Sequence, residues 1–412
     1  MDMPTTQANV PPSPMKPQSD VRTGEDGVHD DIYDVIIIGA GPCGISTALH
    51  LQKLAPNLAE RTLVLDRAVH PREKLCGGGI TPISQALVSQ LDIEFEVPGE
   101  SMVPVQEVRL RFGWQKVSFR QPNIVRVVHR AQFDAALAEG ARKRGVVIKE
   151  GVEVKSIELH DHAVKIETTT GDLWARAVVG ADGAKGIVRR HVVIDEPSRV
   201  SRLIEVLTPE DPASTAEFSK SYLVMDFTPM TQGVQGYAWD FPSMRGGKAY
   251  MNRGVFDSRI FPEHPNADLK KAFADYLAQR GLNLDDYELL GNPGRWFDPD
   301  ATFSGARVLL AGDACGIEPL LSDGISCALW YGEVVAAELV DAFAANDFSF
   351  NGYRGRVLAH PLGQYLTYRL RQARALYAMI SPDGKKNYWR QLKLHAFFFY
   401  LKLRTLRHRS FF

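Results

Sequence analysis

Two groups of residues in this sequence have types and spacing that suit chemistry. The first is Cys76 followed by Gly77, Gly78 and Gly79, in a chain that has only four cysteines. Consecutive glycines lose much conformational entropy on ordering, so they indicate a place where bare backbone must approach something closely. The thiol beside them is either a redox partner, a proton source, or a small side chain that only packs.

The second group is an aromatic run, Gly236-Tyr237-Ala238-Trp239-Asp240-Phe241-Pro242. Tyr237, Trp239 and Phe241 alternate with a period of two, which places all three on one face of a strand. Such a face is either a core layer or the wall of an apolar pocket. The hydroxyl of Tyr237 is able to donate or orient a proton.

A glycine-rich turn, Gly39-Ala40-Gly41-Pro42-Cys43-Gly44, lies between a buried strand and a helix. Gly39 permits a tight turn, Gly41 lets the backbone approach a pyrophosphate, and Gly44 allows close helix–strand packing. Asp66 ends the next strand, where an acid binds ribose hydroxyls. This combination predicts a dinucleotide site.

The elements that must position these groups follow from hydrophobic periodicity. Buried strands are expected at 33–39, 61–66 and 306–316, several alternating strands between 146 and 179, and further strands between 200 and 295. Helices are expected at 41–54, 131–145, 267–281 and 324–344. Nucleotide-type β-α segments thus occur early, midway and late in the chain, and a strand-rich region interrupts them.

Two further strands end in acidic loops, Val179–Gly183 with Asp182 and Leu310–Ala314 with Asp313. A carboxylate in such a loop accepts hydrogen bonds from a sugar-like chain. Together with the glycine-rich turn, these motifs resemble FAD-dependent enzymes of the p-hydroxybenzoate hydroxylase type. The resemblance implies that FAD is the cofactor.

That resemblance also assigns roles to residues. Asp313 would contact the flavin ribityl chain, Asp182 would lie near the cofactor, and Arg130 would lie beside the flavin. The full set of implied cofactor-binding residues is Gly39, Gly41, Pro42, Gly44, Asp66, Arg67, Cys76, Gly77, Arg130, Val154, Asp182, Gly312, Asp313, Pro319, Gly324 and Ile325.

Within that superfamily the Cys-Gly-Gly-Gly segment and the Tyr-x-Trp-x-Phe-Pro run look like the geranylgeranyl reductase branch. A third segment, Glu318–Ile325, resembles the loop that this branch places near the flavin, although Glu318 and Ser322 depart from its usual Asp and Gly. The resemblance implies reduction of isoprenoid carbon–carbon double bonds by hydride from reduced flavin, with Cys76, Tyr237 and Trp239 as catalytic residues.

Other functions fit the same motifs. A flavin monooxygenase acting on an aromatic or polyketide-like compound would share the fold and the FAD site. A flavin halogenase has a Trp-x-Trp-x-Ile-Pro motif, from which Tyr237 and Phe241 depart. A non-catalytic flavoprotein is the third class. No second Rossmann unit for NADPH is recognisable. The expected electron donor is therefore NAD(P)H that binds only transiently, or else ferredoxin or a quinol.

The predicted fold class is α/β, a Rossmann-type (GR2-like) FAD-binding domain with an inserted α+β substrate domain built on an antiparallel sheet. Residues 31–100, 120–200 and 296–345 are assigned to the FAD-binding domain, and 101–119 with 201–295 to the substrate domain. Residues 1–30 are expected to be a disordered tail. Residues 346–412 are expected to form a helical region with a basic, aromatic tail.

Composition narrows the function and the location. A net charge of -1 gives no general attraction to nucleic acid, and the scattered cysteines predict neither a disulfide framework nor a metal site. No apolar run of about 18 residues occurs, so we expect a cytoplasmic protein.

From Lys385 onward there are eight Lys or Arg and no acid. The aromatics of 385–412 either contact an inner membrane face or dock on the protein's own surface.

Overall fold

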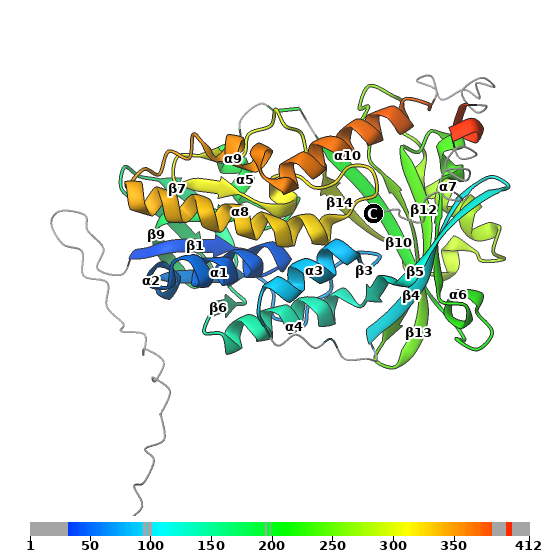
Figure 1. The fold of residues 1–412 in the computed structure, drawn as a ribbon, viewed down its shortest axis with the longest axis horizontal. Helices are drawn as coiled ribbons and strands as arrows, with labels where there is room; N and C mark the ends of the chain where they lie inside the picture. The colour runs from blue at the N-terminus through cyan, green and yellow to red at the C-terminus, as the bar shows by residue number, and fades with distance from the viewer. Residues whose placement is uncertain are drawn as a thin grey trace, which may run out of the picture.

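The computed structural model describes residues 32–93, 97, 101–193, 196–197, 199–380 and 393–397. Two eight-stranded sheets lie side by side, the first with its helices at the left of Figure 1 and the second at the right. The expected disordered tail at 1–30 lies outside the described residues. The expected basic tail also lies outside them, apart from 393–397, where Leu394 is buried.

The first sheet has a parallel centre, as the continuous β-branched strands predict. Its order is β15-β16-β9-β1-β2-β6, and β7 and β8 extend from β9 as an antiparallel pair. Its strands are β1 (Ile32–Ile38), β2 (Thr62–Asp66), β6 (Val147–Glu150), β7 (Val154–Leu159), β8 (Val164–Thr168), β9 (Gly171–Gly180), β15 (Ser304–Gly305) and β16 (Val308–Leu310).

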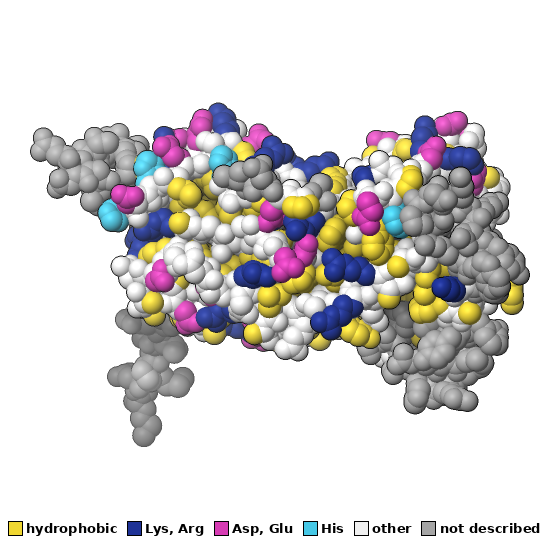
Figure 2. Space-filling model, turned by 90° about the horizontal axis from the view of Figure 1, so that it is seen from above, with side chains coloured by type: hydrophobic (Ala, Val, Ile, Leu, Met, Phe, Trp, Pro, Cys, Tyr) yellow, Lys and Arg dark blue, Asp and Glu magenta, His cyan; other side chains and the backbone are white. Residues whose placement is uncertain are grey.

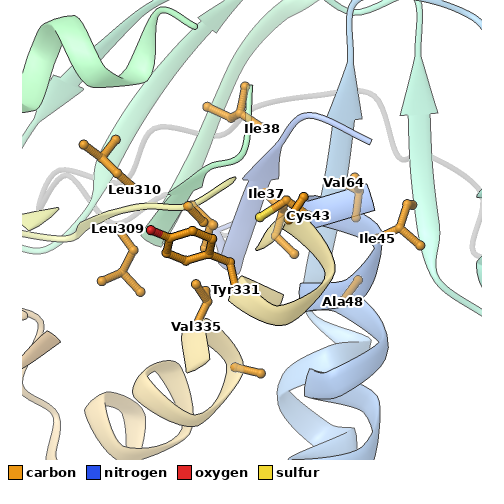
Figure 3. Close-up of a cluster of buried hydrophobic side chains, with 14 of the residues drawn as sticks. Ile37, Ile38, Cys43, Ile45, Ala48, Val64, Leu309, Leu310, Tyr331 and Val335 are labelled. Carbon is orange, nitrogen blue, oxygen red and sulfur yellow. The ribbon is translucent and has the colours of Figure 1, made fainter. Parts of the chain in front are cut away.

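The helices of this half cover the first sheet. They are α1 (Pro42–Leu54), α2 (Pro56–Glu60), α3 (Pro82–Gln90), α4 (Arg130–Lys143), α5 (Val188–Val192), α8 (Gly324–Ala345) and α9 (Tyr353–Ala359). Side chains from β1, β2, β16, α1 and α8 form one buried cluster, in which Ile37, Val64, Leu309 and Tyr331 meet (Figure 3). This core fixes the carboxyl ends of the parallel strands, where ligands bind in such folds.

The second sheet has the order β14-β10-β13-β12-β11-β4-β5-β3, and it is antiparallel except where β11 pairs with β4. Its strands are β3 (Gly79–Ile80), β4 (Met102–Phe112), β5 (Gln115–Val128), β10 (Val200–Pro209), β11 (Tyr222–Asp226), β12 (Gly236–Arg245), β13 (Lys248–Asp257) and β14 (Leu290–Arg295). Helix α6 (Ala216–Ser219) precedes β11, and α7 (Leu269–Ala278) packs on one face. Helix α10 (Pro361–Tyr377) packs its last two turns against the other cluster of this sheet.

The predicted α/β class with an antiparallel second sheet is confirmed. The domain boundaries stay a prediction, but the strands interleave more than those boundaries allow. A division between residues 119 and 120 falls inside β5, which pairs with β4 from Phe112↔Gln115 to Met102↔Val128. Strand β3 also belongs to the second sheet, because it pairs with β5. This pairing brings the glycine segment to the edge of that sheet.

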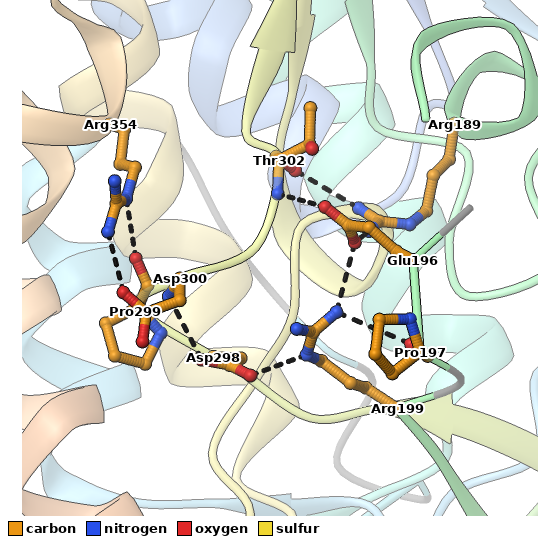
Figure 4. Close-up of polar contacts among 9 residues, drawn as sticks. All are labelled: Arg189, Glu196, Pro197, Arg199, Asp298, Pro299, Asp300, Thr302 and Arg354. Carbon is orange, nitrogen blue, oxygen red and sulfur yellow. Dashed lines mark hydrogen bonds and ion pairs between the residues drawn. The ribbon is translucent and has the colours of Figure 1, made fainter. Parts of the chain in front are cut away.

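A partly buried ionic cluster joins two of the chain crossings between the sheets (Figure 4). Glu196 accepts hydrogen bonds from Arg189 at 2.5 Å and Arg199 at 3.1 Å, and Arg199 donates to Asp298 at 2.6 Å. Arg199 directly precedes β10, and Asp298 follows β14. Because these ion pairs join segments next to both sheets, the cluster helps to hold the second sheet in position against the first.

The outer face that carries α9 and α10 mixes hydrophobic, basic and acidic side chains (Figure 2). Within the described residues, no helix combines the length and the apolar character needed to cross a membrane.

Candidate functional site

A cavity of about 1400 Å³ lies between the two sheets and is lined by residues of both. It brings together fifteen of the eighteen residues predicted to bind the cofactor or to be catalytic, and Gly44, Gly312 and Pro319 are not among its lining. The fifteen are Gly39, Gly41, Pro42, Asp66, Arg67, Cys76, Gly77, Arg130, Val154, Asp182, Tyr237, Trp239, Asp313, Gly324 and Ile325.

The glycine-rich turn has the form that its spacing predicts. Gly39 has a φ of +112°, and a Cβ there would lie 2.3 Å from the carbonyl oxygen of Ala181. A Cβ on Gly44 would lie 1.9 Å from the Gly39 oxygen, so Gly44 serves helix packing, away from the cavity. Gly41 is the N-cap of α1 and lines the cavity.

Asp66 lies at the end of β2, beside this turn. Its carboxylate accepts hydrogen bonds from the backbone N–H groups of Ala40 and Ala68, both at 2.9 Å. The guanidinium of Arg72 lies 3.7 Å away. A carboxylate has more acceptor capacity than two bonds use, so Asp66 both fixes the turn and presents acceptors to the cavity.

Arg130 is buried at the start of α4 and is held by Asp134 in a bidentate pair, with both N–O distances 2.9 Å. Arg72 also approaches Asp134, at 3.3 Å. Burial opposes the charge of Arg130, but the nearby Asp134 and Cys76 outweigh it and raise the pKa of the guanidinium. A permanent cation therefore lies next to the Cys76 side chain.

Each of the three glycines after Cys76 occupies its position for a different structural reason. A Cβ on Gly77 would lie 2.8 Å from the ring of Phe241, so Gly77 lets the loop pack on β12. Gly78 has a φ of +76°, and a Cβ there would lie 2.1 Å from the Val128 oxygen. Gly79 begins β3 and pairs with Val127. The segment is thus bare backbone pressed against the second sheet, with Cys76 facing the cavity.

Two polar side chains of the second sheet hold this loop, and both were missed in the sequence. Asn252 donates to the Cys76 carbonyl at 3.3 Å and accepts from the Trp239 indole N–H at 2.7 Å. Glu205, on the neighbouring strand, is buried beside Asn252 and the Cys76 backbone. Burial raises its pKa to about 7, and its Oε2 has no hydrogen-bond partner among the described residues.

Tyr237 lines the cavity, but its hydroxyl donates to the carbonyl of Leu321 at 2.7 Å. Burial, followed by the nearby Glu318 carboxylate, raises its pKa far above the ordinary range. This proton is engaged with the backbone in the structure. That Tyr237 donates or orients a proton therefore stays a prediction.

The loop that follows β16 is stabilised by hydrogen bonds and an ion pair of Glu318. Glu318 accepts from the N–H groups of Leu320 and Leu321, both at 2.7 Å, and from the guanidinium of Arg369 at 3.0 Å. Asp323, at the end of this loop, caps α8 and lines the cavity. Burial and then the Glu318 carboxylate raise the pKa of Asp323 to about 6, even though Ser326 hydrogen-bonds to it.

The remaining predicted acids, Asp182 and Asp313, also line the cavity. Asp182 accepts from the Val188 N–H at 3.0 Å, its Oδ1 is buried without a partner in the described chain, and burial raises its pKa. Asp313 lines the cavity close to Gly324. Gly312 instead packs against the side chain of Cys43.

One wall of the cavity is a single apolar face of the second sheet. The predicted trio Tyr237, Trp239 and Phe241 lies on it, and neighbouring strands extend it. Its other apolar members are Val108, Phe119, Val125, Leu203, Leu223, Met225 and Phe256.

Helix α10 supplies four cavity residues that the sequence did not indicate: Tyr365, Tyr368, Arg369 and Gln372. Arg369 donates to Gln372 at 3.0 Å in addition to its pair with Glu318. The helix follows the last recognisable motif, and its amphipathic pattern predicts packing but gives no sign of which cavity it borders.

These residues fit a bound dinucleotide. The cavity exceeds the roughly 300–1,000 Å³ of a pocket for one small ligand. The N-cap of α1 has no side-chain cap and its first turn has no acid, so its N–H groups are open to an anion such as a pyrophosphate. The unpartnered Asp182 oxygen and the Asp66 and Asp313 carboxylates provide acceptors for sugar hydroxyls.

Comparisons with known proteins find relatives that match most of the chain. A menaquinone reductase of Mycolicibacterium smegmatis is 25% identical, over 77% of this chain and 78% of its own. A digeranylgeranylglycerophospholipid reductase of Methanosarcina acetivorans is 24% identical, over 77% and 78%. A 1H-pyrrole-2-carbonyl-(peptidyl-carrier protein) chlorinase of Pseudomonas fluorescens is 24% identical, over 80% and 81%.

Solved structures share the fold. A geranylgeranyl bacteriochlorophyll reductase-like protein of Thermoplasma acidophilum superposes with a TM-score of 0.66 at 18% identity, over 92% of this chain and 99% of its own. A halogenase in complex with FAD has a TM-score of 0.64 at 16% identity, over 92% and 84%. The model of the FAD binding domain family matches residues 32–322. The chain therefore belongs to the FAD binding domain family, and it is an FAD-dependent oxidoreductase.

Proposed function

We propose that this protein reduces carbon–carbon double bonds of an apolar, isoprenoid compound. The observation that carries the proposal is the apolar wall of the second sheet, which faces the cofactor-binding motifs across one continuous cavity. Reduced FAD, when bound, supplies the hydride. The relatives named as prenyl-lipid and menaquinone reductases support this class of substrate.

The chain's own residues would hold the cofactor as follows. The N-terminus of α1, behind Gly41, would bind the pyrophosphate. Asp66 would accept hydrogen bonds from the ribose, and Asp313 from the ribityl chain. Arg130, held by Asp134, would lie beside the flavin with a fixed positive charge.

Alkene reduction also needs a proton for the second carbon. Two groups on the cavity wall can release one, the thiol of Cys76 and the carboxyl of Asp323. Asp323 is the better candidate, because a pKa of about 6 lies near physiological pH while the Tyr237 proton is engaged. The aromatic wall would exclude water and hold the alkene by apolar contact.

Product analysis under turnover tests the proposal. We would incubate the FAD-loaded enzyme with dithionite and geranylgeranyl diphosphate in deuterated buffer and measure the mass of the product by mass spectrometry. The proposal expects added hydrogens in whole pairs, with at least one deuterium from solvent in each reduced bond. NAD(P)H, ferredoxin and a quinol would then be compared as physiological donors.

A flavin monooxygenase or halogenase is the alternative, and the similarity to the chlorinase favours it. Those reactions need oxygen and would leave the double bonds intact. An oxygenated or halogenated product, formed only in air, would replace the proposed reaction with this alternative.

A further inference from the structure

Helix α10 presents three connected polar side chains to the main cavity, Tyr368, Arg369 and Gln372, which we call the α10 polar set. Arg369 donates to the side-chain oxygen of Gln372, and Gln372 donates to the hydroxyl of Tyr368, both at 3.0 Å. Residues three and four apart are neighbours on a helix surface, so these bonds align the three side chains along one side of α10. Tyr368 lines the cavity while it is 59% exposed, so the α10 polar set lies where the cavity opens to solvent.

The α10 polar set has hydrogen-bond donors left over. The Tyr368 hydroxyl accepts from Gln372, and its own O–H has no acceptor among the described residues. Within the described chain, Gln372 gives one amide N–H to Tyr368, and Arg369 donates only to Glu318 and Gln372, so both keep further N–H groups. The Gln372 oxygen, in contrast, is already bonded to Arg369. Such a set suits a ligand that brings an acceptor oxygen.

On the neighbouring apolar wall, the polar groups of the aromatic trio are already engaged. The Tyr237 hydroxyl donates to the Leu321 carbonyl, and the Trp239 indole N–H donates to Asn252. Helix α10 packs against the same hydrophobic cluster through Leu370 and other residues of its last two turns. An apolar chain that lies along this wall can therefore reach the α10 polar set with its polar end.

The charge of Arg369 is already compensated. Glu318 accepts from the Arg369 Nε at 3.0 Å and from the Asp323 N–H at 3.3 Å, so one cation lies near two carboxyl groups. This part of the cavity therefore has no surplus positive charge to attract an anion such as a phosphate. The other cations of the cavity lining come from α4 and from the segments that follow β2 and β9: Arg67, Arg72, Lys74, Arg130, Lys185 and Arg190.

We infer that the α10 polar set is a subsite for the polar end of the substrate, and that it takes an uncharged head with an acceptor oxygen, such as a carbonyl. This inference rests on the proposed function, because it assigns the isoprenoid chain to the apolar wall and only its head to α10. The subsite lies beyond residues 32–322, so it is a specificity element that the family model does not include.

The test measures binding to the oxidised, FAD-loaded protein, through perturbation of the flavin absorbance. Three farnesyl compounds differ at the head, because farnesylacetone carries a ketone, farnesyl diphosphate an anion, and farnesene no oxygen. Tyr368→Phe and Gln372→Leu each remove a donor, and the matched control Gln364→Leu changes an exposed residue of α10 that does not line the cavity. We expect farnesylacetone to bind about fivefold more weakly to both variants of the α10 polar set. Farnesene and farnesyl diphosphate should bind as before, and Gln364→Leu should affect none of the three.

Equal weakening of farnesylacetone and farnesene, weakening of neither, or failure of the wild-type protein to bind farnesylacetone would overturn the subsite. Weakening of farnesyl diphosphate as large as that of farnesylacetone would overturn the preference for an uncharged head. If Gln372→Leu does not fold, Tyr368→Phe at its exposed position still decides the question.

The flavin stays oxidised in this experiment, so binding is measured without turnover. Head-dependent binding of farnesylacetone, combined with failure to reduce any prenyl compound, would keep the subsite and reject the proposed reaction. Reduction of prenyl compounds without head-dependent binding would reject the subsite alone.

Discussion

At the scale of single residues, Asp323 has the environment of a proton donor. Burial and the neighbouring Glu318 raise its pKa to about 6, so its carboxyl is protonated below that value and ionised above it. If Asp323 supplies the proton, the rate of alkene reduction falls as pH rises through about 6, approaching tenfold per unit. Measured pH profiles of single-turnover reduction should show this decline.

Single substitutions at Asp323 and Cys76 show which of these two groups supplies the proton. Asp323→Asn should be slow and lose the pH-dependent decline, whereas Cys76→Ala should keep it. The opposite pattern, with the decline retained in Asp323→Asn, would transfer the role to the thiol.

Glu205 makes a different prediction, about stability. Its pKa is raised from the ordinary 4.5 to about 7, so the folded protein binds this proton more tightly than the unfolded chain does. Stability should therefore fall as pH rises from 4.5 through 7, by about 3 kcal/mol in total. Glu205→Gln should remove most of this decline in melting temperature.

The control for Glu205 is Glu158→Gln, which changes a side chain that is 65% exposed. It should leave the pH dependence of melting unchanged. A Glu205→Gln protein that loses stability between pH 5 and pH 8 as steeply as wild type would contradict this account of the buried carboxyl.

At the scale of elements, the glycine segment shows what a sequence can predict. Three glycines indicate close backbone approach, and the structure confirms close contacts at Gly77 and Gly78. Nothing in the local residue pattern indicates that the neighbouring surface is formed by β5 and β12, because strand pairing at this distance along the chain depends on the whole sheet.

Gly78→Ala is expected to destabilise the protein, by about 1–3 kcal/mol from the left-handed backbone alone. The Cβ clash with the Val128 carbonyl adds to this cost. Gly79→Ala is the matched control, since its Cβ would make an ordinary 3.6 Å contact with Val125 and its φ is not positive. Equal melting temperatures for the two variants would contradict this role of Gly78.

The nucleotide-binding elements could be predicted closely, because buried parallel strands and glycine turns leave local signals. Glu205 could not, since a charged residue in an alternating strand predicts a solvent face. Its burial follows from the Cys76 loop covering that face. Arg369 was missed for a similar reason, as a long amphipathic helix does not reveal which cavity it borders.

At the scale of the whole molecule, helix α10 completes a site whose motifs all precede it. It lies beyond residues 32–322, which the family model matches. Through Arg369 it contacts Glu318, and the hydroxyl of Tyr377 donates to the Leu320 carbonyl at 2.7 Å. The loop that carries Asp323 thus depends on both sheets and on this helix.

Arg369→Gln should change the chemistry as well as the stability. Removing the cation leaves Glu318 buried without its partner, which costs about 3 kcal/mol. Arg369 also lowers the pKa of Asp323, so its loss should raise that pKa and move the decline in rate to higher pH. Arg371→Gln, at an exposed position of the same helix, should move neither quantity.

The most direct measurement of the central claim is an anaerobic single turnover. Reduced, FAD-loaded protein is mixed with geranylgeranyl diphosphate without oxygen, and the flavin absorbance is followed. We predict that the flavin reoxidises as the prenyl chain gains hydrogen. A flavin that stays reduced with every prenyl compound, and reoxidises only when air enters, would contradict the alkene reductase and favour an oxygen-dependent reaction.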